Sequence, residues 1–221
     1  MTTAVLFDLD GTLLDTLGDL HLAVNHVLKS FGYPGRTIEE VRRFVGNGAG
    51  RLIHLAVPEG AEEAPVLAAF QAYYADHCNE LTKPYDGILE ALTVLGQQYP
   101  LAVVSNKPDA AVKELAKIYF PNLYARGESV DCPRKPAPDM VYKAMEALNA
   151  QRCVYIGDSD VDILTAKNAS VPCLSVTWGF RDEAELRAAG GTQFCHRPQD
   201  LPAMIHAILL STRNEVNTNG K

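Results

Sequence analysis

The stretch Ala4-Val5-Leu6-Phe7-Asp8-Leu9-Asp10-Gly11-Thr12 decides the fold that we expect for this chain. An apolar run is followed at once by two aspartates and a glycine, which is typical of a buried strand that ends in a polar turn. Asp8 and Asp10 are two positions apart, so their side chains lie on the same side of an extended chain. At the carboxyl end of a parallel strand, both would lie at the edge where open α/β sheets bind their ligands.

Three later apolar runs predict the rest of this sheet. They cover Leu101 to Ser105, Cys153 to Gly157 and Pro172 to Val176, and helical patterns separate them. This alternation indicates a parallel sheet with crossover helices. The runs are apolar at both odd and even positions, as expected when helices cover both faces. We therefore expect an α/β protein whose core is a Rossmann-like, doubly wound parallel sheet.

A helical insertion is expected after the first strand. About 90 residues separate the first two predicted strands, whereas a whole βαβ unit needs roughly 30. Apolar side chains recur at helical spacing from Leu17 to Phe31, Thr37-Ile38-Glu39-Glu40 has the form of a capping box, and Ala64 to Leu81 predicts a third helix. The expected organisation is a catalytic core at residues 1–15 and 83–210, a small α-helical cap at 16–82, and a frayed tail at 211–221.

Composition limits the class of partner. The 221 residues carry a formal net charge of −7, which argues against binding to nucleic acid backbones and favours a small molecule. The N-terminus lacks the basic start of a secretory signal, and no apolar run is long enough to span a membrane. We expect a soluble, cytoplasmic monomer or homodimer. The five cysteines include no CxxC pair, so neither a disulfide framework nor a zinc knuckle is predicted.

The first two polar strand ends suggest a cation site. Asp8 and Asp10 repel each other unless they share a proton or bind a cation, and oxygen ligands favour Mg²⁺. Taken alone, the segment would also fit a simple turn after a strand. Ser105 and Asn106 end the second strand with a hydroxyl and an amide, although such pairs are common at strand ends.

Two further segments add charge to the same edge. Lys135 precedes a helix opened by prolines. A lysine in a loop is usually solvated, but one fixed between acidic strand ends would neutralise both them and a phosphate. The apolar run from Cys153 to Gly157 is followed by Asp158, Asp160 and Asp162. Asp158 is the natural third ligand of a cation, whereas Asp160 would equally cap the following helix.

In this order and spacing, the four segments resemble the motifs of the haloacid dehalogenase superfamily. Its phosphatase branch has DxDGT, an apolar strand ending in Ser or Thr, a lysine before a helix, and GDxxxD. Here these correspond to Asp8 to Thr12, Ser105, Lys135, and Gly157 to Asp162. The helical insertion is similar to the small C1 cap of that superfamily, so the resemblance covers essentially the whole chain.

The resemblance implies a mechanism and a metal. Asp8 would be the nucleophile that forms an aspartyl-phosphate, and Asp10 would be the general acid and then the general base. Mg²⁺ would be bound by the Asp8 side chain, the Asp10 backbone carbonyl and the Asp158 carboxylate, with Asp162 orienting the site from behind. The implied phosphate contacts are Ser105 and Lys135, with support from Thr12 for Asp10 or the loop and a backbone donor at Asn106.

The resemblance also narrows the substrate class. Asp10 favours phosphate esters, because the dehalogenase branch lacks this second aspartate. The segment from Phe44 to Ile53 resembles a glycine-rich cap loop of phosphoglycolate phosphatases, and Arg51 is a candidate cation for a substrate carboxylate. Arg42 and Arg43 fit better as solvated residues of a helix. The first candidate is therefore a Mg²⁺-dependent phosphatase acting on a small phosphorylated metabolite, with 2-phosphoglycolate as the leading substrate.

Other activities remain open. The same motifs serve phosphosugar mutases similar to β-phosphoglucomutase, and pyrophosphatases and nucleotidases of the superfamily. A receiver-like switch, which accepts a phosphoryl group without turnover, is an alternative from another class. The early position of Asp8 and the helical insertion both count against a receiver domain.

Overall fold

A six-stranded parallel sheet forms the centre of the molecule in the computed structural model, which describes residues 2–218 and the side chains up to Ser211. The strand order is β5-β4-β1-β6-β7-β8, and every neighbouring pair runs parallel. The expected α/β class with a parallel sheet is confirmed. The strands are β1 (Thr3–Phe7), β4 (Leu101–Pro108), β5 (Tyr124–Glu128), β6 (Arg152–Gly157), β7 (Cys173–Val176) and β8 (Phe194–Cys195).

The alternation of side chains along β1 builds two hydrophobic layers. Val5 and Phe7 belong to a cluster that includes residues of α5, α6 and α10, while Ala4 and Leu6 belong to a second cluster with α7 and α8. Helices therefore cover both faces, which explains why the strands are apolar at odd and even positions. The helices of the core are α5 (Ile88–Gly96), α6 (Asp109–Tyr119), α7 (Asp139–Ala147), α8 (Asp160–Ala169), α9 (Glu183–Ala188) and α10 (Leu201–Thr218).

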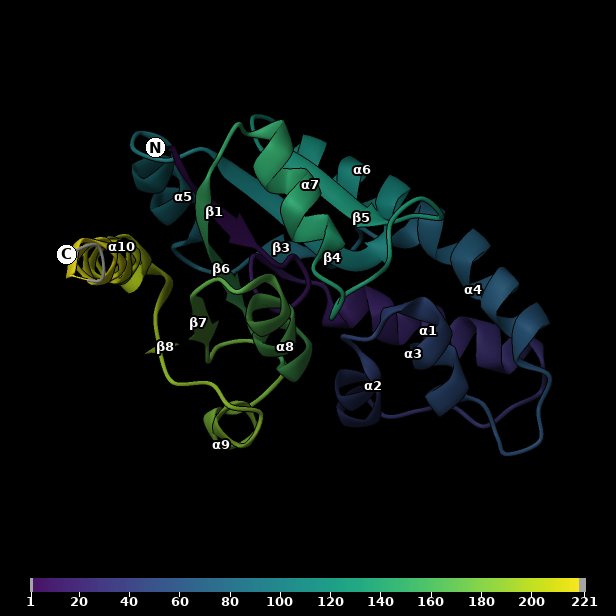
Figure 1. The fold of residues 1–221 in the computed structure, drawn as a ribbon. Coiled ribbons are helices and arrows are strands. Elements are labelled where there is room, and N and C mark those ends of the chain that lie inside the picture. Colours follow the sequence, from purple (N-terminus) through teal and green to yellow (C-terminus); the bar gives the residue numbers. More distant parts are fainter. Residues whose placement is uncertain (1, 219–221) are drawn as a thin grey trace.

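Four helices between β1 and β4 form the helical insert, and Figure 1 shows them grouped beside the sheet. They are α1 (Leu17–Ser30), α2 (Ile38–Phe44), α3 (Gly48–Ala56) and α4 (Glu63–His77). The capping box predicted at Thr37 is present: its hydroxyl accepts from Glu40 N, and the Glu40 carboxylate accepts from Thr37 N. Two short strands, β2 (Leu14–Asp15) and β3 (Lys83–Pro84), pair antiparallel where the chain enters and leaves the insert.

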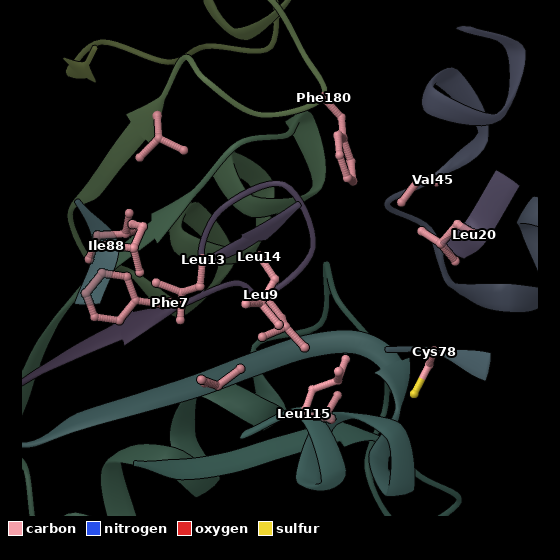
Figure 2. Packing of buried hydrophobic residues seen from close by; sticks show 14 of the residues in the cluster. Phe7, Leu9, Leu13, Leu14, Leu20, Val45, Cys78, Ile88, Leu115 and Phe180 are labelled. Carbon is pink, nitrogen blue, oxygen red and sulfur yellow. The ribbon is translucent and has the colours of Figure 1, made fainter. Parts of the chain in front are cut away.

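The insert and the sheet share one hydrophobic cluster. Leu20 and Val45 from the insert belong to the same buried cluster as Leu9 and Phe180 from the core (Figure 2). Since apolar surface is removed from water on both sides, this contact stabilises the position of the insert over the sheet.

The structure differs from the sequence prediction at three places. The glycine-rich segment after Phe44 is a loop only as far as Asn47, and α3 begins at Gly48. The edge strands β5 and β8 were not expected. The helix α10 extends to Thr218, and residues 219–221 of the expected tail lie outside the described residues. No helix between residues 2 and 218 combines the length and hydropathy needed to cross a bilayer.

Candidate active site

The chain turns sharply after β1 and leaves two aspartates at the carboxyl edge of the sheet. Asp8 N still donates to Ile156 O of β6 at 2.9 Å, which continues the ladder by one residue. Gly11 then adopts a φ of +80°, and a Cβ atom at this position would overlap the Asp158 carboxylate. Only glycine satisfies both the backbone angle and the close approach. The turn therefore brings the β1 and β6 strand ends into direct contact.

The Asp8 carboxylate is held on one of its two oxygens. Oδ1 accepts from Leu9 N at 2.7 Å and lies 2.9 Å from Lys135 Nζ. Within residues 2–218, no hydrogen bond to Oδ2 is formed. Asp8 is 6% exposed, and burial, together with repulsion from Asp162 and despite the attraction of Lys135, raises the pKa of its carboxyl well above the ordinary value.

Asp158 is fixed by one hydrogen bond to each oxygen. Thr12 Oγ1 donates to Oδ1 at 3.0 Å, and Phe180 N donates to Oδ2 at 2.7 Å. Burial and the neighbouring Asp162 raise the pKa of the Asp158 carboxyl to about 7. Thr12 thus contacts Asp158, whereas we expected it to support Asp10 or the loop; the hydroxyl that contacts Asp10 is that of Thr16.

Asp8, Asp158 and Asp162 each place a carboxylate oxygen within 4.8 Å of the others, and all three are buried. Buried carboxylates in such proximity raise one another's pKa unless a cation neutralises them. An all-oxygen, acidic donor set is what Mg²⁺ prefers. Burial first, and repulsion from Asp162 second, raise the pKa of Asp8 and of Asp158. A cation bound to these buried oxygens would offset both effects, so the residues present fit a divalent cation.

Lys135 and Asp162 form the buried base of the site. Lys135 Nζ lies 2.8 Å from Asp162 Oδ1 and 3.0 Å from Tyr155 Oη, and Lys135 is 1% exposed. Burial lowers the pKa of the ammonium, but attraction to Asp162 and Asp8 outweighs it, so the pKa is raised well above the ordinary value. Asp162 Oδ2 accepts from Ser159 N and Oγ at 3.1 and 2.6 Å, so both of its oxygens are occupied.

Asp10 is bound by two residues that the sequence analysis did not single out. Its Oδ1 accepts from Thr16 Oγ1 at 2.6 Å and from Lys107 Nζ at 2.7 Å. No described residue donates to Oδ2, as for Asp8. The pKa of Lys107 is raised because its attraction to Asp10 and Tyr74 outweighs the effect of burial.

A cavity opens over these groups, between the insert and the sheet. Five of the predicted site residues line it: Asp8, Asp10, Ser105, Asn106 and Asp158. Thr12, Lys135 and Asp162 lie beneath this surface. The insert contributes a mainly apolar wall from Leu20, Val45, Gly46, Gly48, Ala49, Leu52, Phe70 and Tyr74.

Two residues that were predicted to contact the substrate, Arg51 and Asn106, differ from the prediction in where they lie or what they bind. Arg51 is exposed and lines a separate hollow with Arg43 and Asp160, outside the cavity that contains Asp8. The Asn106 side chain donates to Gly46 O and Lys135 O at 3.1 and 3.0 Å, so its amide joins the insert to the loop that carries Lys135.

Besides Thr16, three residues at the site were missed. Lys107 follows Ser105 by two positions on β4, and this spacing, which places both on one side of a strand, was a usable signal. Tyr74 lies on the buried face of α4 with Val66 and Phe70, but apolar residues occur all around this helix, so the spacing did not single it out. Arg181 had no signal in the sequence. It donates from its guanidinium to three backbone oxygens at the end of α2, those of Arg42, Arg43 and Val45.

Comparisons with known proteins agree with this geometry. The family model for haloacid dehalogenase-like hydrolases matches residues 5–176. A phosphoglycolate phosphatase from Rhodobacter capsulatus is 35% identical over 192 residues, which cover 82% of this chain and 87% of that protein. The plasmid-encoded phosphoglycolate phosphatase of Cupriavidus necator is 32% identical over 216 residues, covering 92% of this chain and 93% of that protein.

Solved structures show the same architecture. The crystal structure of a proposed phosphoglycolate phosphatase from Lactobacillus delbrueckii subsp. bulgaricus superposes with a TM-score of 0.86 at 36% identity, covering 91% of this chain and 97% of that one. The family match spans the helical insert and the strands β1, β4 and β6, which lead into Asp8, Ser105 and Asp158. The chain therefore belongs to the haloacid dehalogenase-like hydrolases.

Proposed function

We propose that this chain is a Mg²⁺-dependent phosphatase that hydrolyses 2-phosphoglycolate to glycolate and phosphate through an aspartyl-phosphate on Asp8. The observation that carries the proposal is the pair of aspartates, each with Oδ1 bound by a lysine and Oδ2 free. Lys135 lies beside Asp8, and Lys107 lies beside Asp10. The curated relatives described as phosphoglycolate phosphatases support the choice of substrate.

Asp8 and Asp158 would hold the metal with their carboxylates, together with the Asp10 backbone carbonyl. Asp162 suits a supporting role, because Lys135 and Ser159 already occupy both of its oxygens. When bound, the metal supplies positive charge that draws electron density from the phosphoryl oxygens and aligns the phosphate with Asp8.

In the first half-reaction, Asp8 Oδ2 attacks phosphorus, and the bond from phosphorus to the alcohol oxygen breaks. Asp10 donates its proton to that oxygen, so the alcohol leaves neutral. Ser105 and Lys135 bind the equatorial oxygens, where negative charge is spread in the transition state. Lys135 also fixes Asp8 Oδ1, which directs the other oxygen toward the substrate.

In the second half-reaction, Asp10, now a carboxylate, removes a proton from water as the water oxygen attacks the phosphorus of the aspartyl-phosphate. The bond from phosphorus to Asp8 breaks, phosphate leaves, and both aspartates return to their starting states. The apolar wall of the insert limits bulk water around the intermediate.

The test is phosphate release from 2-phosphoglycolate by the purified chain, with and without Mg²⁺, against a panel of phosphorylated metabolites. Asp8→Asn is expected to lower kcat by at least about 1,000-fold, since the attacking oxygen is lost. Asp160→Asn, which changes a nearby carboxylate that is half exposed, is the control. Unchanged activity in Asp8→Asn would refute the nucleophile.

The panel also separates the alternatives. Isomerisation of a hexose 1-phosphate with a catalytic bisphosphate, without net phosphate release, would show a mutase. Faster turnover of pyrophosphate or a nucleotide would move the assignment to those activities. Stable phosphorylation of the chain with no turnover would indicate a receiver-like switch.

A further inference from the structure

Lys107 and Tyr74 form a contact between the core and the insert inside the cavity that contains Asp8. Lys107 lies on β4 and Tyr74 on α4, and both line that cavity. Lys107 Nζ lies 2.7 Å from Asp10 Oδ1 and 4.7 Å from the centre of the Tyr74 ring, a cation–π distance. The Lys107 side chain is 2% exposed. A buried ammonium is thus placed next to the aspartate that we assign to proton transfer.

Lys107 and Tyr74 both have hydrogen-bond donors that are not used within the described residues. Tyr74 is 3% exposed, and its Oη has no hydrogen-bond partner of normal geometry; among the described residues, only Arg126 Nε shares that condition. A buried hydroxyl without a partner is costly and rare in native proteins. The Lys107 ammonium has three N–H donors, and Asp10 accepts one hydrogen bond from it.

The other cations near the cavity are committed elsewhere. Lys135, which the proposed mechanism assigns to the phosphoryl oxygens, is already held by Asp8 and Asp162 at the base of the site. Arg181 lines the cavity, but its guanidinium donates to backbone oxygens of the insert. In the part of the chain that the structure describes, Lys107 is therefore the cavity cation best able to bind a second anion.

The start of α3 adds further donors to the same wall. Gly46, Gly48 and Ala49 line the cavity, and α3 begins at Gly48 without a side chain that caps its first turn. Unpaired N–H groups at a helix start favour negative charge. The wall of the cavity thus carries hydrogen-bond donors from Lys107, Tyr74 and the start of α3. The other side chains that the insert contributes to this wall are apolar.

We propose that Lys107 and Tyr74 bind a carboxylate on the alcohol part of the substrate, which makes this chain selective for phosphate esters of 2-hydroxy acids. The inference rests on the proposed function and extends it to a substrate class. It also moves the carboxylate site from Arg51, which lies outside the cavity, to residues within it.

The distances agree with a carboxylate next to the ester carbon. Asp10 must lie within hydrogen-bond reach of the ester oxygen, and Lys107 Nζ lies 2.7 Å from the same carboxylate. The ester oxygen would contact the other oxygen of that carboxylate, Oδ2, so its distance from Nζ is about 5–8 Å, two hydrogen-bond lengths and the width of the carboxylate. In a 2-hydroxy acid ester, the carboxylate oxygens lie about 3 Å from the ester oxygen, so a carboxylate turned toward Nζ comes within hydrogen-bond reach over the shorter part of that range. A neutral alcohol of the same size would leave the Lys107 donors without a charged partner.

The experiment compares two substrates of nearly equal size, 2-phosphoglycolate and 2-hydroxyethyl phosphate, through the ratio of their kcat/KM values. Losses that affect both substrates cancel in this ratio. We expect the wild-type chain to prefer 2-phosphoglycolate and Lys107→Met to lower the ratio by about 10- to 100-fold, the value of a charge-assisted hydrogen bond. Lys113→Met, which removes an exposed lysine on α6, is the matched control and should leave the ratio unchanged.

Tyr74→Phe provides a second variant in case Lys107→Met does not fold. It removes only an unpartnered hydroxyl, so its thermal midpoint should be retained or raised, and the ratio should fall by about 3- to 10-fold. Equal losses on both substrates, or an unchanged ratio in both variants, would overturn the inference, as would a wild-type preference for 2-hydroxyethyl phosphate.

Calorimetric binding of sodium glycolate separates this inference from the proposed function. If the wild-type chain hydrolyses neither ester, the proposed function fails, and glycolate binding alone decides the carboxylate site. Glycolate binding that is weakened in Lys107→Met and Tyr74→Phe but retained in Lys113→Met would support the site. No glycolate binding, or equal binding by all the proteins, would overturn it.

Discussion

Asp158→Asn is expected to make the metal-free protein more stable at pH 8 while removing its response to Mg²⁺. The folded chain raises the pKa of Asp158 to about 7 from an ordinary 3.8, because the carboxyl is buried near Asp162. This difference corresponds to about 4 kcal/mol of unfolding free energy that the ionised carboxylate costs above pH 7. Asparagine removes the charge but loses the hydrogen bond from Phe180 N, worth about 1–2 kcal/mol.

The net expected gain is about 2–3 kcal/mol, or about 4–12 °C in Tm for a domain of this size. Its pH dependence has a definite sign. A carboxyl whose folded pKa is raised stabilises the fold at low pH, and this contribution is lost as the pH rises from 3.8 to about 7. The advantage of the variant over the wild type should therefore be smaller at pH 5.5 than at pH 8 by about 2 kcal/mol.

The assay is thermal or urea unfolding of wild type and variant at both pH values, first with a chelator and then with Mg²⁺. Mg²⁺ should raise the Tm of the wild type, more at pH 8 than at pH 5.5 because protons compete for the same oxygens, and it should leave the variant unchanged. Asp160→Asn, which changes an exposed neighbouring carboxylate, should respond like the wild type. A variant less stable than wild type at pH 8 without metal, or one with a full Mg²⁺ response, would refute the reasoning.

Three further changes test other parts of the site. Gly11→Ala should lower the unfolding free energy by at least about 2 kcal/mol in urea titrations, because alanine combines an unfavourable φ with an overlap of the Asp158 carboxylate; a loss below about 0.5 kcal/mol would contradict this. Arg181→Gln should lower Tm by about 2–6 °C by scanning calorimetry, since three carbonyls of the insert lose a charged donor; an unchanged Tm would show that these bonds contribute nothing. Tyr155→Phe should cost about 1–3 kcal/mol, because Lys135 loses an acceptor and Val104 O a donor; an unchanged urea midpoint would count against this network.

Much of the catalytic edge could be predicted from the sequence because parallel strands bring their carboxyl ends together. Asp8, Ser105 and Asp158 each follow an apolar run, so the expected sheet alone places them at one edge. Lys135 and Asp162, which the resemblance assigns to one site, lie 2.8 Å apart from Nζ to Oδ1.

The insert was harder to predict because its side chains pack on a surface that belongs to another part of the chain. In α4, apolar residues occur on every side, so the face that buries Tyr74 was not distinguished from the rest. In α3, the glycines around Gly48 suggested a loop, but contacts of Leu52 and Ile53 with the core cluster stabilise a helix. β5 lies at the edge of the sheet, where Tyr124 to Arg126 are only partly buried, so its sequence lacks the apolar run of a central strand.

The place of β1 in the sheet has a consequence for the order of folding. Val5 pairs with Leu101 on one side and Val154 on the other, so the strand that carries Asp8 finds its neighbours only after the whole insert and much of the core have been synthesised. Until then both of its edges are unpaired and apolar, a state that favours association with other chains. The helices α1 and α4 have no such delay, because they contact each other directly and both are synthesised before β4. During synthesis, the contact between α1 and α4 is therefore available before the sheet can form, and the edge that carries Asp8 is completed last.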